Sequence, residues 1–380
     1  MAVRTKPLSE QVVVVTGASS GIGRATANEF ARHGARVVVA ARGEEALATL
    51  VSQIEEAGGQ ALAVPTDVAQ WPQVQALAQA AVDRYGQIDT WVNAAAVHLY
   101  GRAEDITVDE FARVIHINLM GQVHGAYAAL PHLRRSGGGV LIGVSSVEGI
   151  RAVPLQAPYV TSKWALRGFY DVLRMELMAE KAPVAVTTIL PASIDTPLFA
   201  HARSKLDALP KPPPPVYAPE AVARAIVKAA THPTREVPVG GSALQFILAQ
   251  RFAPALTDRL MAVRRVGYAS QVADRPDTGA DNLEQPMPGP GTVHSSHLGH
   301  AFSRSRYTEW FGHHPAVQRT ALAAAGLTAT VAIPVAAYAS GRAKQRSSWQ
   351  TRAARQATTL VAQGRRWAER AERWGRSRLV

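Results

Sequence analysis

A tyrosine and a lysine four residues apart could carry acid–base chemistry in this chain. Tyr159 and Lys163 stand in P-Y-V-T-S-K. Positions i and i+4 of a helix lie on one face, so we expect the phenol and the ammonium to be neighbours. A nearby cation lowers the pKa of a phenol from about 10 toward neutrality, which makes the phenol a usable acid or base. Such pairs are common in proteins. The position of this pair after a predicted strand that ends in serine makes the pattern specific.

Two other polar side chains precede this pair. Ser146 ends the buried run G-V-L-I-G-V-S-S over residues 139–146, and its hydroxyl could donate a hydrogen bond to the same substrate oxygen as Tyr159. Asn118 lies within a long apolar stretch, 107–133, that we predict to be helical. The buried amide of Asn118 is either satisfied within the core, or it opens the helix locally and holds a water molecule.

A strand, a glycine-rich turn and a helix near the start of the chain must position a ligand for these groups. The sequence V-V-V-V-T-G-A-S-S-G-I-G fills residues 12–23, and a helical pattern begins at Arg24. This order presents backbone N–H groups and the positive end of a helix to a phosphate. Gly17 permits the tight turn, Gly21 allows the backbone to approach a pyrophosphate, and Gly23 allows helix to pack on strand.

The second predicted strand, 35–41, ends at Arg42 with no acidic residue. A carboxylate at this position would hold the ribose 2′-hydroxyl of NAD. Arg42, together with Arg24 after the glycine turn, instead favours a 2′-phosphate and therefore NADP(H). The alternative is that both arginines are simply solvated.

Strands and helices alternate along the rest of the first 242 residues, which predicts an α/β fold with a doubly wound parallel sheet flanked by helices. Asp67 follows the third strand, where it could accept from an adenine amino group or cap the next helix. Thr196, in the loop P-A-S-I-D-T-P after the sixth strand, could bond a nicotinamide carboxamide. The predicted strands are 60–66, 88–93, 184–190 and 236–239, and the predicted helices are 44–57, 70–85 and 218–230.

Residues 8–242 resemble the short-chain dehydrogenase/reductase family, in a bacterial-type form with a long C-terminal extension. The resemblance rests on T-G-A-S-S-G-I-G, Asp67, N-A-A at 93–95, the four polar residues described first, and the loop 191–197. Two alanines, Ala95 and Ala192, stand where the family has glycine. The family implies a Rossmann-like fold, a nicotinamide cofactor and a dimer or tetramer formed through long helices. The catalytic tetrad that it implies is Asn118, Ser146, Tyr159 and Lys163.

The resemblance also assigns roles to these residues. Tyr159 would exchange a proton with a carbonyl or alcohol oxygen, Ser146 would steady that oxygen, and Asn118 would keep a water that links Lys163 to solvent. Lys163 would lower the pKa of the tyrosine and bond the nicotinamide ribose. The implied cofactor-binding residues are Gly17, Ser19, Ser20, Gly21, Ile22, Gly23, Arg42, Asp67, Val68, Asn93, Ala94, Tyr159, Lys163, Pro191, Ile194 and Thr196.

Charge is concentrated at the end of the 380-residue chain. The net charge is +12, but residues 342–380 hold 11 Lys or Arg and two Glu, a balance of +9. The chain has no cysteine, which excludes disulfides, thiolate metal sites and cysteine nucleophiles. The first residues lack the apolar core of a secretory signal, so we expect a cytoplasmic catalytic domain.

The extension carries less specific signals. We expect residues 243–315 to be partly irregular and to cover the substrate, beginning with an apolar helical stretch over 244–256. His294, His297 and His300 have no carboxylate nearby at ligand spacing, so we expect no metal site.

The last two predicted segments suggest a membrane. Within 316–341, residues 320–341 contain no charge and are long enough to span a bilayer, although they are mostly Ala and Thr and contain Pro334. The basic amphipathic tail 342–380 carries Leu360, Trp367 and Trp374 at a seven-residue spacing. We therefore expect membrane association, by a transmembrane helix or a surface helix. The alternatives are a partner-binding or solvated helix and, less favoured, a nucleic-acid tail.

Together these patterns predict an NADP(H)-dependent oxidoreductase, with NAD(H) as the rival cofactor, that interconverts a carbonyl and a secondary alcohol on a lipophilic small molecule. The alternative is a cofactor-bound, non-catalytic scaffold or sensor that acts through its basic tail.

Overall fold

The computed structural model describes residues 3–206, 208–263, 271–276, 279–295, 301–305, 307 and 308. All of them belong to one compact unit, Met1–Gly326. The predicted segments 316–341 and 342–380 lie outside the described residues, as do His297 and His300. The proposed domain boundary at residue 242 stays a prediction.

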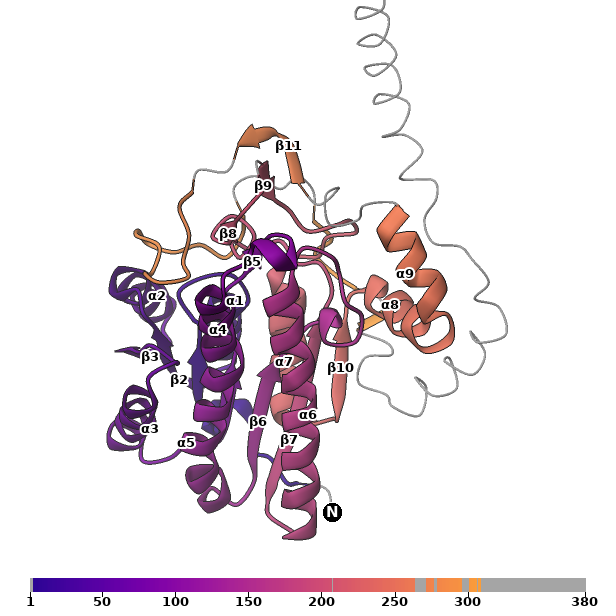
Figure 1. Cartoon of the computed structure of the whole chain (residues 1–380). Helices are drawn as coiled ribbons and strands as arrows, with labels where there is room; N and C mark the ends of the chain where they lie inside the picture. The colour runs from indigo at the N-terminus through magenta and orange to yellow at the C-terminus, as the bar shows by residue number, and fades with distance from the viewer. Residues whose placement is uncertain are drawn as a thin grey trace, which may run out of the picture. The chain divides into compact units, whose positions relative to one another are not determined.

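A seven-stranded sheet forms the centre of the molecule (Figure 1), with the strand order β10-β7-β6-β4-β1-β2-β3. Every pair of neighbouring strands in this sheet is parallel. The strands are β1 Val12–Thr16, β2 Arg36–Ala41, β3 Gln60–Pro65, β4 Thr90–Asn93, β6 Gly139–Val144, β7 Val184–Pro191 and β10 Glu236–Val239. This confirms the predicted doubly wound α/β class. The chain order reverses between β1 and β4, and ligands bind such sheets at the carboxyl ends of the strands on either side of that point.

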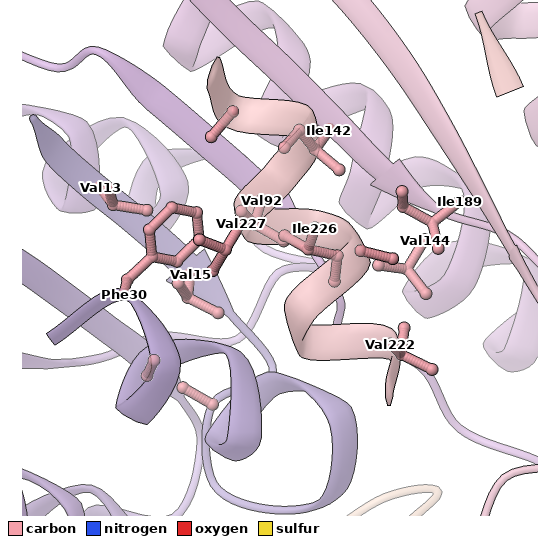
Figure 2. Close-up of a cluster of buried hydrophobic side chains, with 14 of the residues drawn as sticks. Val13, Val15, Phe30, Val92, Ile142, Val144, Ile189, Val222, Ile226 and Val227 are labelled. Carbon is pink, nitrogen blue, oxygen red and sulfur yellow. The ribbon is translucent and has the colours of Figure 1, made fainter. Parts of the chain in front are cut away.

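Helices cover both faces of the sheet. On one face, Phe30 of α1 and Val222, Ile226 and Val227 of α7 pack against inward-facing strand residues such as Val13 (Figure 2). Leucines of α2 belong to the same cluster. The opposite cluster gathers side chains from α3, α4, α5 and α6. These helices are α1 Gly21–Arg32, α2 Glu44–Glu56, α3 Trp71–Tyr85, α4 Val108–Ile115, α5 Gly121–Arg135, α6 Ala157–Ala179 and α7 Pro219–Thr231.

The helix predicted over residues 107–133 is interrupted at Asn118. A π-helical turn, His116–Met120, separates α4 from α5. Single π-turns inside helices occur mostly at functional sites, because they change which backbone groups are bonded. The local opening that the sequence left as one alternative is therefore present.

Short elements outside the central sheet come from the extension and from the residues before it. The predicted apolar helix is two helices, α8 Gly241–Phe252 and α9 Pro254–Val263. Pro254 begins α9 because it lacks the N–H that would continue α8. β11 Gln271–Pro276 pairs with β9 Ala208–Pro210, and β5 Leu99–Tyr100 pairs with β8 Arg203–Ser204. Short 3₁₀ helices cover Leu8–Glu10, Ala103–Asp105 and Val147–Gly149.

The expectation of a transmembrane helix, and with it of a membrane-associated location, is corrected. No helix in the part of the chain that the structure describes has the length and apolar character that crossing a bilayer requires. The segment 320–341 on which the expectation rested is rich in Ala and Thr and poor in Leu, Ile and Val, the residues that favour insertion most.

Candidate active site

A cavity of about 340 Å³ opens at the carboxyl ends of the central strands. It brings together nearly all of the residues that the sequence singled out. Those that line it are Gly17, Ser19, Ser20, Gly21, Ile22, Gly23, Arg42, Asp67, Val68, Ala94, Ser146, Tyr159, Lys163, Pro191, Ile194 and Thr196. The side chains of Asn93 and Asn118 lie behind its wall.

The glycine-rich turn forms the floor at the start of α1. Gly17 has a positive φ of 71°, and a Cβ there would lie 2.6 Å from Ala95 Cα. A Cβ on Gly23 would lie 2.1 Å from the carbonyl oxygen of Gly17. Both positions therefore exclude any side chain, and residues 19–23 at the N-terminus of α1 line the cavity. Thr196 closes the far side of this turn, with its Cβ 3.1 Å from the position that a Cβ on Gly21 would take.

The two arginines expected at the 2′-position of the ribose differ in the structure. Arg42 lines the cavity, and its guanidinium donates to the carbonyl oxygens of residues 282–284. Arg24 is 2 % exposed. Its guanidinium donates to the carbonyl oxygens of Ala46 and Pro290 at 2.8 and 3.0 Å. Arg24 is neither free for a phosphate nor solvated, and both sequence interpretations of this residue are wrong.

Asp67 is held by local bonds at the rim of the cavity. Its carboxylate accepts from the backbone N–H of Ala69 at 3.0 Å and pairs with Arg113 at 3.4 Å. The bond to Ala69 closes a local turn, and the next helix, α3, has Gln70 as its N-cap with no side-chain cap bond, so the helix-capping role that the sequence allowed for Asp67 is not present.

Tyr159 and Lys163 lie on one face of the first turns of α6, as the spacing predicts. Lys163 is 1 % exposed, and its ammonium lies 5.3 Å from the centroid of the Tyr159 ring. Lys163 Nζ donates to the carbonyl oxygen of Val144 at 3.0 Å, which ties α6 to the end of β6. Ser146 Oγ accepts from the backbone N–H of Glu148 at 3.1 Å, so its own proton can be donated to a ligand.

The electrostatics of Tyr159 differ from the expectation. Burial raises the pKa of Tyr159 well above its usual value, and the carboxylate of Glu148 raises it further, while the Ser146 hydroxyl lowers it. Burial also lowers the pKa of Lys163 against the opposing effect of Glu148. A phenol and an ammonium that share a dry site both favour their neutral forms, because desolvation penalises each charge. The sequence could not show this burial.

A polar cluster beside Tyr159 was missed at the level of sequence. Burial raises the pKa of Glu148 well above its usual value, against the opposing effect of Lys163. In the amide orientation that satisfies both of its polar atoms, the Gln156 nitrogen donates to the Glu148 carboxylate at 3.0 Å and to His98 Nε2 at 2.8 Å. The ring of His98 stacks on that of Tyr159 with centroids 4.1 Å apart. Burial lowers the pKa of His98 to about 3, so this imidazole is neutral.

Asn118 is a satisfied amide inside the π-turn. Its Oδ1 accepts from the backbone N–H of Val97 at 2.8 Å, and its Nδ2 donates to the carbonyl oxygen of the same residue at 2.9 Å. A longer bond, 3.3 Å, reaches Ser162 Oγ on α6. Asn118 therefore fastens the helix to the loop after β4 and to the helix that carries Tyr159.

Asn93 has a comparable structural position. Its Oδ1 accepts from Trp91 Nε1 at 2.8 Å, and its Nδ2 donates to the carbonyl oxygen of Gln122 and to Tyr170 Oη. These partners place the Asn93 side chain on the side of the sheet covered by α5 and α6. Asn93 does not line the cavity.

Part of the cavity wall, in contact with the glycine turn, comes from the extension. We call residues 281–295 the strap. Asn282 and residues 286–292 of the strap line the cavity, as does Phe246 of α8. His294, in the strap, bonds to Asp195 and Glu220, two carboxylates distant in sequence. Among the described residues, no group of three or more His, Cys, Asp or Glu side chains is arranged to hold a metal ion.

Known proteins share these features. A family model described as short chain dehydrogenase matches residues 11–207. The oxidoreductase YxnA of Bacillus subtilis is 43% identical over 310 residues, 80% of this chain and 86% of the relative. An oxidoreductase of Listeria innocua is 38% identical over 192 residues, 50% of this chain and 77% of the relative.

Two solved structures are similar in fold. A short chain dehydrogenase/reductase from Burkholderia phymatum, in complex with NAD, has a TM-score of 0.59 and 26% identity, and the match covers 64% of this chain and 93% of that one. An alcohol dehydrogenase from the archaeon Thermococcus sibiricus, complexed with 5-hydroxy-NADP, has a TM-score of 0.54 and 27% identity, over 60% of this chain and 95% of that one. With the parallel sheet, the glycine turn and the Tyr159–Lys163 pair, these matches show that the chain is an oxidoreductase of the short-chain dehydrogenase/reductase family.

Proposed function

We propose that this protein is an NADP(H)-dependent oxidoreductase that interconverts a carbonyl and a secondary alcohol on a lipophilic small molecule. The observation that carries the proposal is one cavity that holds Tyr159, Lys163 and Ser146 at one end and the glycine-rich turn at the other. Acid–base groups and a phosphate-binding turn that share a cavity are what coupled proton and hydride transfer requires.

The residues of the cavity fit a nicotinamide dinucleotide. The turn at Gly17 and Gly23 has no room for a Cβ, and it presents the N-terminus of α1, which is the surface that binds a pyrophosphate. When bound, the nicotinamide would donate or accept a hydride. The absence of an acid after β2 and the position of Arg42 in the cavity wall favour the 2′-phosphate of NADP(H).

The proton would move at the phenol of Tyr159. Its raised pKa keeps the phenol protonated near neutral pH, which suits donation to a carbonyl oxygen. Ser146 would donate a second hydrogen bond to that oxygen, because its Oγ accepts from the Glu148 N–H and the hydroxyl proton stays available. The stacked ring of His98 holds the phenol in place from one side, and Lys163 is fixed beside it by the carbonyl of Val144.

The shape of the cavity near Tyr159 supports a lipophilic substrate. Apolar side chains from the loop before α6, the loops after β7 and β9, and α8 line the cavity together with the polar cluster beside Tyr159. The apolar residues are Val153, Leu198, Phe199, Pro213 and Phe246.

We also propose that the protein is a homo-oligomer that associates through its long helices. α6 carries exposed Trp164, Val172 and Met175, with exposed fractions of 45, 50 and 60%, and α5 carries exposed Tyr127. Positions 164, 172 and 175 lie along one side of a helix. A second copy of the same helices would cover this apolar side in a symmetric interface.

The test measures NADPH and NADH oxidation against aldehydes and ketones of increasing chain length. Replacing Tyr159 with Phe should lower turnover by about 10²- to 10⁴-fold, the usual contribution of general acid–base catalysis, and leave NADPH binding intact. Tyr85→Phe, at the end of α3 and outside the cavity lining, is the matched control. Turnover that rises with chain length would support a lipophilic substrate.

Two results would contradict the proposal. Wild-type turnover in Tyr159→Phe would remove the role of the phenol. NADPH binding with no turnover on any carbonyl would favour the non-catalytic scaffold instead.

A further inference from the structure

The first end of the strap is fastened to β8 and α4. Asp281 forms an ion pair with Arg203 at 2.8 Å, and the carbonyl oxygen of Leu283 accepts from Arg113 at 3.3 Å. Leu283 is fully buried in the cluster on the α3–α6 face of the sheet. This end of the strap is therefore attached by an apolar side chain as well as by charges.

The middle of the strap crosses the glycine-rich turn. The backbone N–H of Gly21, the first residue of α1, donates to the carbonyl oxygen of Thr292 at 2.9 Å. A Cβ on Gly291 would lie 2.2 Å from the carbonyl oxygen of Ser19, so the two backbones are in direct contact. In Figure 1 the orange trace of the strap runs beside α2.

A second set of bonds joins the strap to α2. The carbonyl oxygen of Pro290 accepts from Thr49 Oγ1 at 2.6 Å and from Arg24 at 3.0 Å. The backbone N–H of Gly289 donates to Glu45 at 3.1 Å. Buried Arg24 thus binds α1, α2 and the strap with a single guanidinium.

The far end of the strap is held by His294. Its Nδ1 lies 3.1 Å from Asp195, in the loop after β7, and its Nε2 lies 2.9 Å from Glu220, at the start of α7. Both carboxylates need a proton on the ring nitrogen that faces them, and together they raise the pKa of His294 against the effect of its burial. Asp195 also accepts from the backbone N–H of Ser295 at 3.2 Å.

These contacts lie on one side of the cavity. The N-terminus of α1 binds the pyrophosphate and the end of β2 reads the adenosine ribose in a fold of this kind. The strap contacts both places, at Gly21 and at Arg42. Gly291 and Thr292 of the strap line the same cavity as Ser20 and Ile22 of the turn, so the strap contacts the turn directly and borders the space proposed for the dinucleotide.

We propose that the strap is a part of the cofactor site, a cover over the adenosine side of the bound dinucleotide that must open for cofactor exchange. This rests on the proposed cofactor site and goes beyond it, because it assigns a binding element to residues outside the 11–207 family match. The cover slows the release of NADPH, and its backbone contacts increase the affinity for NADPH. His294 is the latch, since it is the described side chain that joins the end of the strap to two other elements.

The test measures NADPH association, dissociation and equilibrium binding by its fluorescence on the full-length protein, without any substrate. Replacing His294 with Ala should raise the dissociation rate about tenfold or more, and the Kd with it, because the cover then opens more often. Glu220→Gln, which removes one partner of the latch from the other side, should have the same direction of effect. His232→Ala is the control, because His232 lies at the end of α7 and bonds only locally, to Thr231.

Hydrogen–deuterium exchange of the strap gives an independent reading. A cover predicts that NADPH slows exchange in residues 282–295, because the strap closes on the cofactor. Two results would overturn the proposal. The first is a lower Kd for NADPH in His294→Ala together with faster exchange of the strap when NADPH is added, which would mean that the strap occupies the cofactor's place. The second is unchanged binding kinetics in both latch variants. A wild-type protein that binds neither NADPH nor NADH would refute the proposed function itself.

Discussion

Arg42 donates hydrogen bonds to the strap, and we propose that it also binds the 2′-phosphate of the cofactor. Its guanidinium has five N–H donors, so the strap carbonyls of residues 282–284 do not exhaust it. Replacing Arg42 with Asp should weaken NADPH binding about tenfold or more relative to NADH, since a hydrogen bond to a charged group contributes roughly 1.5–3 kcal/mol. The ratio of the two Kd values is the measurement.

Arg113 provides the matched control for Arg42. It also binds the strap, through the carbonyl of Leu283 and the carboxylate of Glu284, but it does not line the cavity. Arg113→Gln should therefore weaken both cofactors alike. An unchanged NADPH-to-NADH ratio in Arg42→Asp would assign that arginine to the strap alone and leave the preference for NADP(H) without support.

Glu148 sets the pH dependence of the proposed reaction. Its negative charge raises the pKa of Tyr159, so removing the charge should lower that pKa. Alcohol oxidation needs the phenolate, and its pH midpoint should therefore lie lower in Glu148→Gln than in wild type, by roughly one pH unit. The pH profile of kcat/KM for oxidation measures it. Glu104→Gln, at an exposed site, should leave the midpoint in place, and an equal midpoint in both variants would refute the role of Glu148.

The sequence predicted the residues of the site where a motif or a regular spacing identified them. The i, i+4 spacing placed Tyr159 beside Lys163, and the glycines placed the turn. Glu148 stands two residues after Ser146, a position that could have been examined, but only the fold shows that its carboxyl is buried. His98 gave no signal, because its role depends on stacking against residues far along the chain.

At the scale of elements, we expect the strap to open locally at a lower free energy than the sheet unfolds. Segments with few buried apolar contacts open locally at a lower free energy than the whole domain. Leu283→Ala should therefore cost less global stability than Leu141→Ala in β6, although both side chains are fully buried. We expect about 2–5 kcal/mol for Leu141→Ala, measured by urea unfolding.

The corresponding effect of Leu283→Ala should appear in the strap. Hydrogen exchange of residues 282–295 should become faster while the sheet keeps its protection. Equal losses of global stability in the two variants would show that the strap unfolds only with the rest of the domain.

The main elements were predictable because most strands of the sheet are short apolar runs rich in Val, Ile and Ala between turn signals. Two features could not be predicted from the sequence, for different physical reasons. The pairs β5–β8 and β9–β11 include strands of only two or three residues, too short to show a period of two. The strap has no regular structure, and its bonds use mostly backbone carbonyls, which every sequence possesses.

At the scale of the whole molecule, the exposed side of α6 predicts a change of oligomeric state. Met175→Glu places a charge in the apolar stripe beside Val172, and desolvating an unpaired carboxylate in an interface is costly. Size-exclusion chromatography with light scattering should show a smaller species than wild type. Val108→Glu, on the highly exposed first residue of α4, is the control. An unchanged mass in Met175→Glu would exclude this side of α6 as the interface.

The bonds of the strap also affect the order in which the molecule assembles during synthesis. They close loops of 242 residues at Arg42 and 266 residues at Arg24. Such long loops carry a large closure entropy, and the strap is translated after every strand of the sheet. A nascent chain that has already formed the sheet presents an uncovered glycine turn to the surrounding nucleotides. Slow cofactor exchange in the folded protein is therefore compatible with rapid binding of the first cofactor molecule, because that molecule can bind before the strap has been synthesised.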